Sequence, residues 1–525
     1  MKHYPFSVFV LAPFSKTGRA TDTPPLVGPF DMYDVDEGLR SLDCIINVSL
    51  PRDVCPDGET QIKIDSIASL KPRNVVRNSA FLASLVEALD YVKKHRTDPE
   101  SMAMGLQRQF GHLPLDLSVL TQDPMPQAAP EGSVSLLESI LSEMEANDVR
   151  TSAPPLEVQI EEMLKTALAC VYRDADFRRL ESSIRGLQML VRQGPIKKSV
   201  KTSVTLCNVD AHNIENALRH IVRSSAERSP SLVLVDLPFD NSFASIDMLE
   251  TLANFSEAIH VPTVVQLSAD FFGKSTWTEI SAVGFLKNEL KAGTYAKFRE
   301  LQSAPSTRWL TLTLPKICFR NPYTVDGPVR PVAFEEPGPV QISSVWAIGT
   351  LAAKSQNAFG WPSRLTDAGI CQLDQLVIPK TADRNTPLEA LFDEDRISQF
   401  HEVGMAPLCG MACQTQIFLP HAPSMNNDTL GFQLFANRVI EFFHDQKKEL
   451  EKNSEIRDTS VLVGHLKTAF LSKWADTDQP QPDDFTISVA YTDDTGQVVL
   501  AVRMTPSRAI VPVPKLLAFE VTFVL

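Results

Sequence analysis

Long hydrophobic runs are missing from this sequence of 525 residues. A helix needs about 20 consecutive apolar residues to cross a bilayer, and no stretch approaches that length. The apolar run Val8–Ala12 is short and lies between Pro5 and Pro13, which is too broken for the apolar region of a signal peptide. We therefore expect no membrane insertion and a cytoplasmic protein, in which this run forms a buried strand.

Positive charge is also in short supply. Lys and Arg total 50 against 64 Asp and Glu, which gives a net charge of −14. Phosphate backbones are bound by concentrated positive charge, so this balance argues against nucleic acid as the main partner.

Cysteine is sparse and scattered: of eight residues, only Cys409 and Cys413 lie close together. A zinc site needs a second matched pair nearby, and the sequence has none. The ten His are isolated in sequence, and a lone His is usually a surface or core residue. The sequence therefore predicts reduced cysteines, no metal and no cofactor.

A chain of this length is too long for one core, so two or three domains are expected. Residues 1–96 form the first predicted domain. It opens with the strand candidate Phe6–Ala12 and continues with the alternating strand Gln61–Ile64. A helix follows at about residues 74–93, where apolar residues recur at helical spacing.

The middle of the chain changes composition twice. Residues 97–132 are rich in proline and in small polar residues, which predicts a linker. Within it, Leu115–Leu120 fits a short strand and a solvated linker equally well. A helical segment is predicted at residues 133–230, with long helices at about 156–173 and 177–192.

The first helix of that segment, at residues 135–144, is short and amphipathic. One face carries the apolar stripe Leu136, Leu137, Ile140, Leu141 and Met144. Such a helix usually packs into the nearest core. Because it follows a Pro-rich segment, the pattern is also compatible with an exposed docking peptide, and both interpretations stay open.

Residues 231–525 are predicted to form an α/β layered domain that ends in β structure. The apolar run Ser231–Leu237 is typical of a strand buried on both faces, and helices and strands alternate from there to about residue 450. A hairpin is predicted near the end, with a turn at 493–496 and a returning strand at Gln497–Met504.

Two strands of this C-terminal region have a marked apolar face. The first strand of the hairpin carries on that face Phe485, Ile487, Val489 and Tyr491. The last strand, at residues 517–525, carries Leu517, Phe519, Val521, Phe523 and Leu525. An apolar strand at a chain end has to be covered, either by its own sheet or by another subunit.

One segment resembles a nucleotide site. Gly273–Thr276 has the letters that end a phosphate-binding loop, and Leu232–Asp236 looks like a metal-holding strand. The loop lacks its first glycine, because that position is Ser268, and the strand precedes the loop instead of following it. Without the glycine bend the backbone amides cannot converge on phosphate. The sequence therefore predicts that the chain is not an enzyme, with a nucleotide-binding enzyme as the alternative.

Residues 172–191 resemble the signature of the large subunit of the type VI secretion sheath (VipB/TssC family). That signature has an acidic residue and Phe, then Leu-Glu, then Trp-Arg-Gly-Leu. The matching residues are Phe177, Leu180, Glu181, Arg185, Gly186 and Leu187. Ile184 stands where the family usually has Trp.

A second segment resembles the central block of the same family. It comprises Phe298-Arg299, Arg308–Pro315, Arg320–Tyr323, Phe334–Glu336, Trp346-Ala347 and Gly360-Trp361.

The N-terminal block resembles the small subunit of the same sheath (VipA/TssB family). Pro5-Phe6, Val10-Leu11 and Phe14-Ser15 resemble its opening strand. Leu70–Val75 resembles its Phe-x-Pro-x-x-Val segment, in which Leu70 replaces Phe. The two resemblances together cover about residues 5–94 and 135–525. The chain thus resembles a shortened fusion of two subunits that are separate chains in most relatives.

This resemblance implies a structural subunit of a contractile sheath with a mixed layered α/β core, in the bacterial cytoplasm. Protomers of this family exchange terminal strands, polymerise around an inner tube on a baseplate, and contract to drive the tube into a target. The exchanged strands would be those carrying Phe485, Ile487, Val489, Leu517, Phe519, Val521 and Phe523.

The resemblance also implies a recycling partner. The helix with Leu136, Leu137, Ile140 and Leu141 lies where relatives are gripped by a ClpV-type AAA+ unfoldase.

A non-contracting scaffold or baseplate protein is a further alternative, which would bind partners and form no tubes.

Overall fold

The computed structural model describes residues 5–15, 23–96, 99–120, 155–225, 229–380, 385–453, 458–475, 479–492 and 497–524, apart from Lys198, Val200, Pro480 and Asp483. The predicted helix at 135–144, the predicted turn at 493–496 and Leu525 lie outside these residues. None of the helices within the described ranges combines the length and the apolar composition that crossing a membrane requires.

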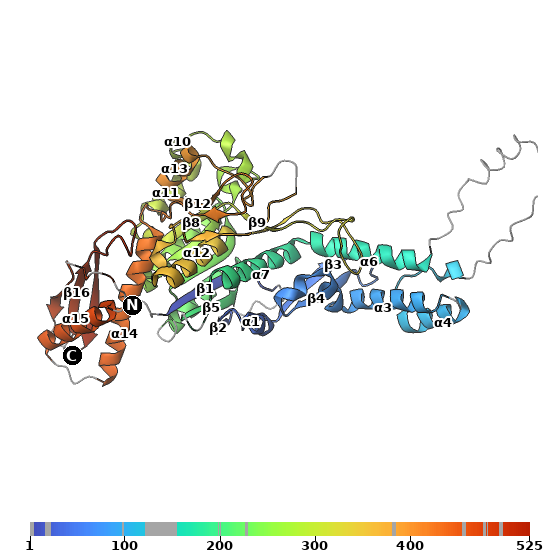
Figure 1. Cartoon of the computed structure of the whole chain (residues 1–525), viewed down its shortest axis with the longest axis horizontal. Helices are drawn as coiled ribbons and strands as arrows, with labels where there is room; N and C mark the ends of the chain where they lie inside the picture. Colours follow the sequence, from blue (N-terminus) through green and yellow to red (C-terminus); the bar gives the residue numbers. More distant parts are fainter. Residues whose placement is uncertain are drawn as a thin grey trace, which may run out of the picture.

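A seven-stranded sheet forms the centre of the molecule (Figure 1). Its order is β12 (Met405–Pro407), β8 (Leu310–Leu314), β7 (Thr263–Leu267), β6 (Leu232–Phe239), β1 (Phe6–Ala12), β5 (Thr202–Asn208) and β2 (Leu26–Phe30). Every pair is parallel except β2, which runs antiparallel to β5. The central strands are apolar on both faces because both faces are covered, as in other parallel sheets.

Helices cover the two faces of this sheet, which gives three layers. One face is covered by α7 (Ala175–Gln193) and α12 (Ser344–Phe359), the other by α8 (Ile214–Ser224) and α9 (Phe243–Ile259). Strand β1 shows the alternation: Val8 and Val10 belong to the core with α7, and Phe9 and Leu11 to the core with α9. The predicted α/β layered fold class is confirmed.

The first 96 residues share their core with the rest of the chain. Strand β1 pairs with β5 from Phe6↔Thr202 to Ala12↔Asn208 and with β6 on its other side. The hairpin of β3 (Cys44–Ser49) and β4 (Glu59–Ile64) belongs to the same hydrophobic cluster as helix α6 (Leu156–Arg173). The predicted boundary at residue 96 therefore does not coincide with a break in the hydrophobic core.

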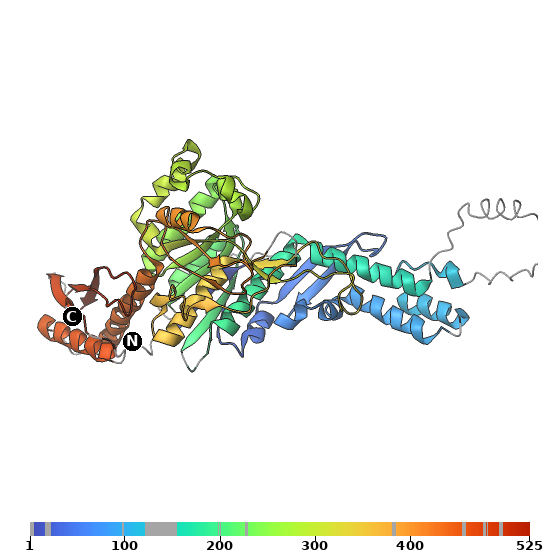
Figure 2. The same cartoon turned by 45° about the horizontal axis from the view of Figure 1, so that its top comes forward.

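The molecule is elongated, with one group of elements at each end of the central sheet (Figures 1 and 2). One end is formed by α3 (Ala80–Lys94), α4 (Pro99–Phe110) and α6. The other end is formed by the C-terminal strands with α14 (Leu430–Asn453) and α15 (Thr459–Ala475). The N-terminal and C-terminal parts of the sequence thus build opposite extensions of one central layer.

Two local predictions differ from the structure, and at a third place the structure decides between two alternatives left open. The described part of the linker predicted at 97–132 contains helix α4, and Pro99 suits its first turn. The short strand considered at Leu115–Leu120 is a 3₁₀ turn, η2 (Leu117–Leu120), because the Asp116 carboxylate accepts from Ser118 N and bends the chain. The helix predicted at 74–93 is two helices, because Ser79 caps the second by accepting from Leu82 N at 3.2 Å.

The remaining elements are short. The helices are α1 (Val35–Ser41), α2 (Pro72–Arg77), α10 (Leu286–Glu289), α11 (Ala296–Gln302) and α13 (Glu394–Glu402). The strands are β9 (Ile317–Arg320) with β10 (Val340–Ile342), and β11 (Gln372–Leu373) with β14 (Ile417–Phe418) and β13 (Cys409–Gly410). The 3₁₀ segments are η1 (Ile67–Leu70), η4 (Ala269–Phe272), η5 (Trp277–Ala282), η6 (Gly293–Tyr295), η7 (Pro305–Trp309) and η8 (Pro362–Arg364).

Candidate assembly surface and its supporting ion network

The C-terminal strands form a separate antiparallel sheet in the order β15 (Thr486–Thr492), β16 (Gln497–Met504), β17 (Leu517–Val524). Strand β16 is paired on both sides, from Thr486↔Arg503 with β15 and from Gln497↔Val524 with β17. Strands β15 and β17 therefore each keep one edge that no strand of the described residues occupies. The amides and carbonyls along such edges can pair with a strand from another chain.

The apolar face of this sheet is covered by helices of the same chain. Phe485 stacks on Phe470 of α15 with ring centroids 4.4 Å apart, and Phe519 contacts Phe443 of α14 at 5.6 Å. The buried residues Leu517, Val521 and Phe523 belong to the same cluster. The sequence left open whether the terminal strand is covered by its own chain or by another subunit, and in the structure α14 and α15 of the same chain cover its apolar face. The outer edges of β15 and β17 stay open to a neighbour.

Strand β15 is the more exposed of the two edge strands. Ile487 is half-buried, while Val489 and Tyr491 are 47% and 61% exposed. The strand sequence TISVAYT has no charged residue and no proline, the devices with which proteins usually block a free edge. This strand is therefore suited to association.

A buried ion network lies between α7 and strand β9, and the sequence patterns did not predict it. Arg320 donates to both carboxylate oxygens of Glu181, at 2.8 and 2.7 Å, and to both oxygens of Glu336, at 2.6 and 3.0 Å. The two carboxylate side chains are fully buried. Arg178 and Arg185 add further bonds, to Glu336 and Glu181 respectively.

The electrostatics of the network follow from burial and pairing. Burial by itself would lower the pKa of Arg320, but the hydrogen bonds and charges of Glu181 and Glu336 outweigh it and raise that pKa. Burial, together with the charge of Glu181, raises the pKa of Tyr172, whose ring lies beneath the Arg320 guanidinium. Arg320 therefore stays charged and Tyr172 stays neutral.

These residues come from the two segments that carried the family resemblance. Glu181 and Arg185 belong to residues 172–191, and Arg320 and Glu336 to the central block. The motifs therefore contained the residues of the network. They did not show that two acidic residues from separate segments bind the same guanidinium.

The presence of glycine at position 186 is explained by the contact between α7 and α12. A Cβ on Gly186 would lie 2.3 Å from Nε1 of Trp346, so only glycine lets α7 and α12 approach this closely. Trp346 Nε1 in turn donates to Asp236 at 2.8 Å. The motif residues therefore serve to lock α7 onto α12 and the central sheet.

The Gly273–Thr276 loop is not arranged as a phosphate site. Gly273 adopts a left-handed conformation (φ 64°), but the hydroxyls of Ser275 and Thr276 donate to Glu279. The segment that follows is the 3₁₀ helix η5, so the loop does not open onto the N-terminus of an α-helix as a phosphate loop does. This geometry gives no support to the nucleotide alternative.

Comparison with known proteins identifies sheath proteins. Residues 225–426 match the family model described as VipB: EvpB/VC_A0108, tail sheath N-terminal domain. The chain is 25% identical over 296 residues to the type VI secretion system sheath protein TssC1 of Pseudomonas aeruginosa. That match covers 50% of this chain and 59% of the relative, so the chain spans about three fifths of that protein's length.

Solved structures with a weaker likeness come from contractile machines. A chain of the anti-feeding prophage baseplate is 11% identical, with a TM-score of 0.37, over 62% of this chain and 76% of that chain. A chain of the contracted anti-feeding prophage sheath is also 11% identical, with a TM-score of 0.33, over 65% of this chain and 78% of that chain. Similarities of this size do not by themselves identify a fold.

Proposed function

We propose that this chain, whose residues 225–426 form a domain of the VipB tail sheath family, is a structural subunit of a contractile injection sheath. The family match is the observation that carries this proposal. The relative that is 25% identical over 296 residues is described as a sheath protein. In this role the chain polymerises around an inner tube and contracts to drive the tube into a target.

The open edges of β15 and β17 support a way of linking protomers. A strand from a neighbouring protomer that pairs with one of these edges would satisfy its unpaired backbone groups. Such a contact joins two different surfaces, so it can repeat from protomer to protomer, and it builds a helical filament where the rotation does not close into a ring. Six of the predicted strand residues then act by holding the accepting sheet against α14 and α15: Phe485, Ile487, Leu517, Phe519, Val521 and Phe523. Val489 is exposed on β15 and is available to the neighbouring strand.

Contraction requires protomers that move as units. The buried network around Arg320 and the two-sided central sheet make the core of each protomer rigid, while the strand linkages serve as tethers. The sheath then switches between two packings of the same folded units, without nucleotide hydrolysis in the sheath itself.

The partners of the proposed sheath are an inner tube protein and a baseplate, in the cytoplasm of a bacterium. A ClpV-type AAA+ unfoldase is proposed to recycle contracted sheaths by gripping residues 135–144. The apolar stripe of Leu136, Leu137, Ile140 and Leu141 is the suggested handle.

Electron microscopy of the full-length protein tests the proposal. After expression and purification, negative-stain images should show tubes or cogwheel-like helical fragments, and light scattering should show particles that grow with concentration. A strictly monomeric species at high concentration by both methods would contradict a sheath subunit.

A further inference from the structure

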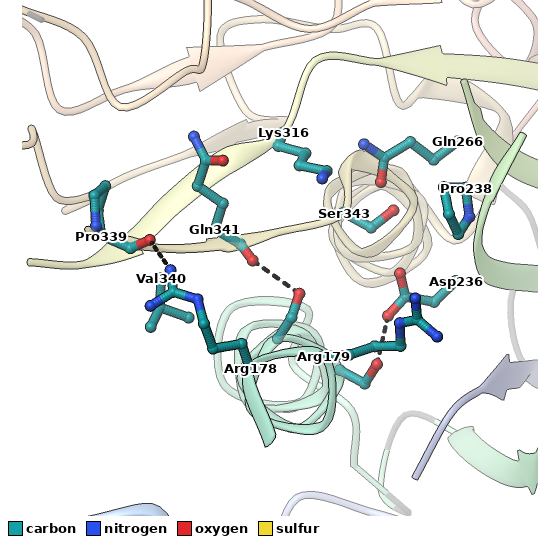
Figure 3. A pocket seen from close by; sticks show the side chains of 12 residues that line it. Arg178, Arg179, Asp236, Pro238, Gln266, Lys316, Pro339, Val340, Gln341 and Ser343 are labelled. Carbon is teal, nitrogen blue, oxygen red and sulfur yellow. Dashed lines mark hydrogen bonds between the residues drawn. The ribbon is translucent and has the colours of Figure 1, made fainter. Parts of the chain in front are cut away.

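A cavity of about 260 Å³ lies at the carboxyl ends of three central strands (Figure 3). Asp236 and Pro238 at the end of β6, Gln266 near the end of β7 and Lys316 after β8 form one wall. Arg178 and Arg179 from α7 form another. In open α/β sheets this edge, outside the carboxyl ends of parallel strands, is where ligands bind.

The charges around the cavity are unbalanced toward the positive. Its lining residues include three cations and a single carboxylate, Asp236. Arg178 is occupied, because it donates to Glu336 at 3.1 Å and to the carbonyl of Pro339 at 2.9 Å. The side chains of Arg179 and Lys316, in contrast, make no hydrogen bond and no ion pair with a described residue, although the charge of Lys316 also acts on Asp236. Two cations therefore remain for a ligand.

Gln266 supplies an independent sign of a missing acceptor. Its side chain is only 3% exposed, yet its Nε2 has no hydrogen-bond partner among the described residues. Figure 3 shows its amide directed into the same space as the Lys316 ammonium. Buried amide donors are almost always paired, because leaving one unpaired is unfavourable. A ligand in the cavity with an acceptor atom would give the Gln266 amide the hydrogen-bond partner that it lacks.

The N-terminus of α12 adds to the positive potential in the cavity. Ser343 lines the cavity and caps this helix of 16 residues. The start of a helix carries partial positive charge and attracts anions. Asp236 is held by its own donors, Ser183 Oγ and Trp346 Nε1, each at 2.8 Å, so it is already engaged with the protein.

We propose that this cavity is a binding site for a small oxyanion of the phosphate or carboxylate class. Lys316 and Arg179 neutralise its charge, and Gln266 Nε2 donates a hydrogen bond to one of its oxygens. A bound anion would tie the ends of β6, β7 and β8 to α7, across the junction that the proposed sheath protomer needs to be rigid. The inference concerns a ligand site and holds whether or not the protein forms a sheath.

Thermal unfolding of the full chain tests this site with inorganic phosphate as the probe and malonate as a second one. Each anion is titrated at constant ionic strength against chloride. The Tm should rise with the logarithm of the anion concentration, because a ligand that binds only the folded state stabilises it. A rise with malonate alone or with phosphate alone supports the site and assigns the ligand to that one class.

Three variants locate the effect. Lys316→Met should weaken the apparent affinity by at least about tenfold, because it removes a charged partner. Gln266→Leu should lose the response while keeping or raising the Tm without anion, because it removes an unpaired buried donor. Lys274→Met, on the Gly273–Thr276 loop outside the cavity lining, should respond like the wild type.

Two results would overturn the inference. One is a Tm that neither anion changes at constant ionic strength, which would mean that the cavity holds nothing but water. The other is an equal response of all three variants, which would mean that the anions act on the protein surface in general.

Discussion

Arg320 holds Glu181 in a two-pronged pair, with bonds of 2.8 and 2.7 Å to the two oxygens of one carboxylate, across 139 positions of sequence. The Glu181 side chain is fully buried and that of Arg320 is 14% exposed. The planar guanidinium matches a carboxylate in this geometry, which an ammonium cannot do. Arg320, the last residue of β9, thus anchors helix α7.

Removing that anchor should be costly. Arg320→Met leaves both Glu181 and Glu336 buried without their main partner, and we expect about 3–5 kcal/mol of lost stability, measured by urea unfolding. Arg219→Met is the matched control, because its pair with Glu215 is more than half exposed and should contribute less than about 1 kcal/mol. Equal losses in the two variants would contradict a structural role for the network.

Gly186 and Gly464 should respond in opposite ways to the same substitution. Gly186→Ala drives a methyl group against Trp346, where it would lie 2.3 Å from Nε1, so we expect a loss of about 1–3 kcal/mol. Gly464→Ala lies inside α15 with nothing within 4 Å of the new Cβ, so it should gain up to about 1 kcal/mol. Unfolding curves of both proteins under one condition check the contrast, and a neutral Gly186→Ala would show that α7 and α12 can move apart freely.

Stability should depend on pH through Glu441. Burial, and then the neighbouring Asp445, raise the pKa of Glu441 from an ordinary value of 4.5 to about 8. Because the folded protein binds this proton more tightly than the unfolded chain, the contribution of Glu441 to stability is fully present below pH 4.5 and is lost as the pH rises through about 8. The slope is at most about 1.4 kcal/mol per pH unit.

Glu441→Gln isolates this contribution. Glu441 lines a cavity together with His260 and His444. Burial lowers the pKa of both histidines, so below pH 6.5 their effect on stability has the opposite sign to that of Glu441. Arg438, Asp445 and Lys448 also act on Glu441. The difference in unfolding free energy between wild type and Glu441→Gln should therefore change with pH between 5 and 8, and a constant difference would refute the shift.

The β15 edge should be needed for assembly and not for folding. Val489→Lys with Tyr491→Lys places two charges on exposed positions of this edge, so tube formation should be lost while the Tm stays close to that of the wild type. Val222→Lys, at an exposed position of α8, is the matched control and should still form tubes. Normal tubes from the double variant would place the protomer linkage elsewhere.

The helix predicted at residues 135–144 gives a test of recycling. Leu137→Glu with Ile140→Glu should leave tubes at wild-type yield and let contracted sheaths persist, because the unfoldase loses its apolar handle. Melting curves are recorded beside the tube counts. A clear fall in Tm would mean that the helix is packed in the core, and unchanged melting with unchanged unfoldase binding would mean that the handle lies elsewhere.

The local elements were largely predictable from the sequence. Alternation at Glu59–Ile64 and the unbroken apolar run at Leu232–Val235 each indicate a strand with a definite burial, because side-chain period and burial are local properties. The helices α6 and α7 follow in the same way. Where the Ser79 side chain caps a helix, the same periodicity gave the wrong helix ends. At Leu115–Leu120 it left a strand and a linker open, and the bond from Ser118 N to Asp116 belongs to a 3₁₀ turn.

What the sequence determined by itself was the set of strands and helices, the acidic character, and the motif residues with their family resemblance. The tertiary structure alone decided which of these meet. Strand β1 lies between β5 and β6, although Phe6 pairs with Thr202 and Val8 with Leu232. Arg320 bonds Glu181 and Glu336, which belong to different segments of the sequence. It also decided that the apolar face of β17 is covered by α14 and α15 of the same chain. The physical reason is that periodicity records which face of an element is apolar, while the partner that buries that face is chosen only when the whole chain packs.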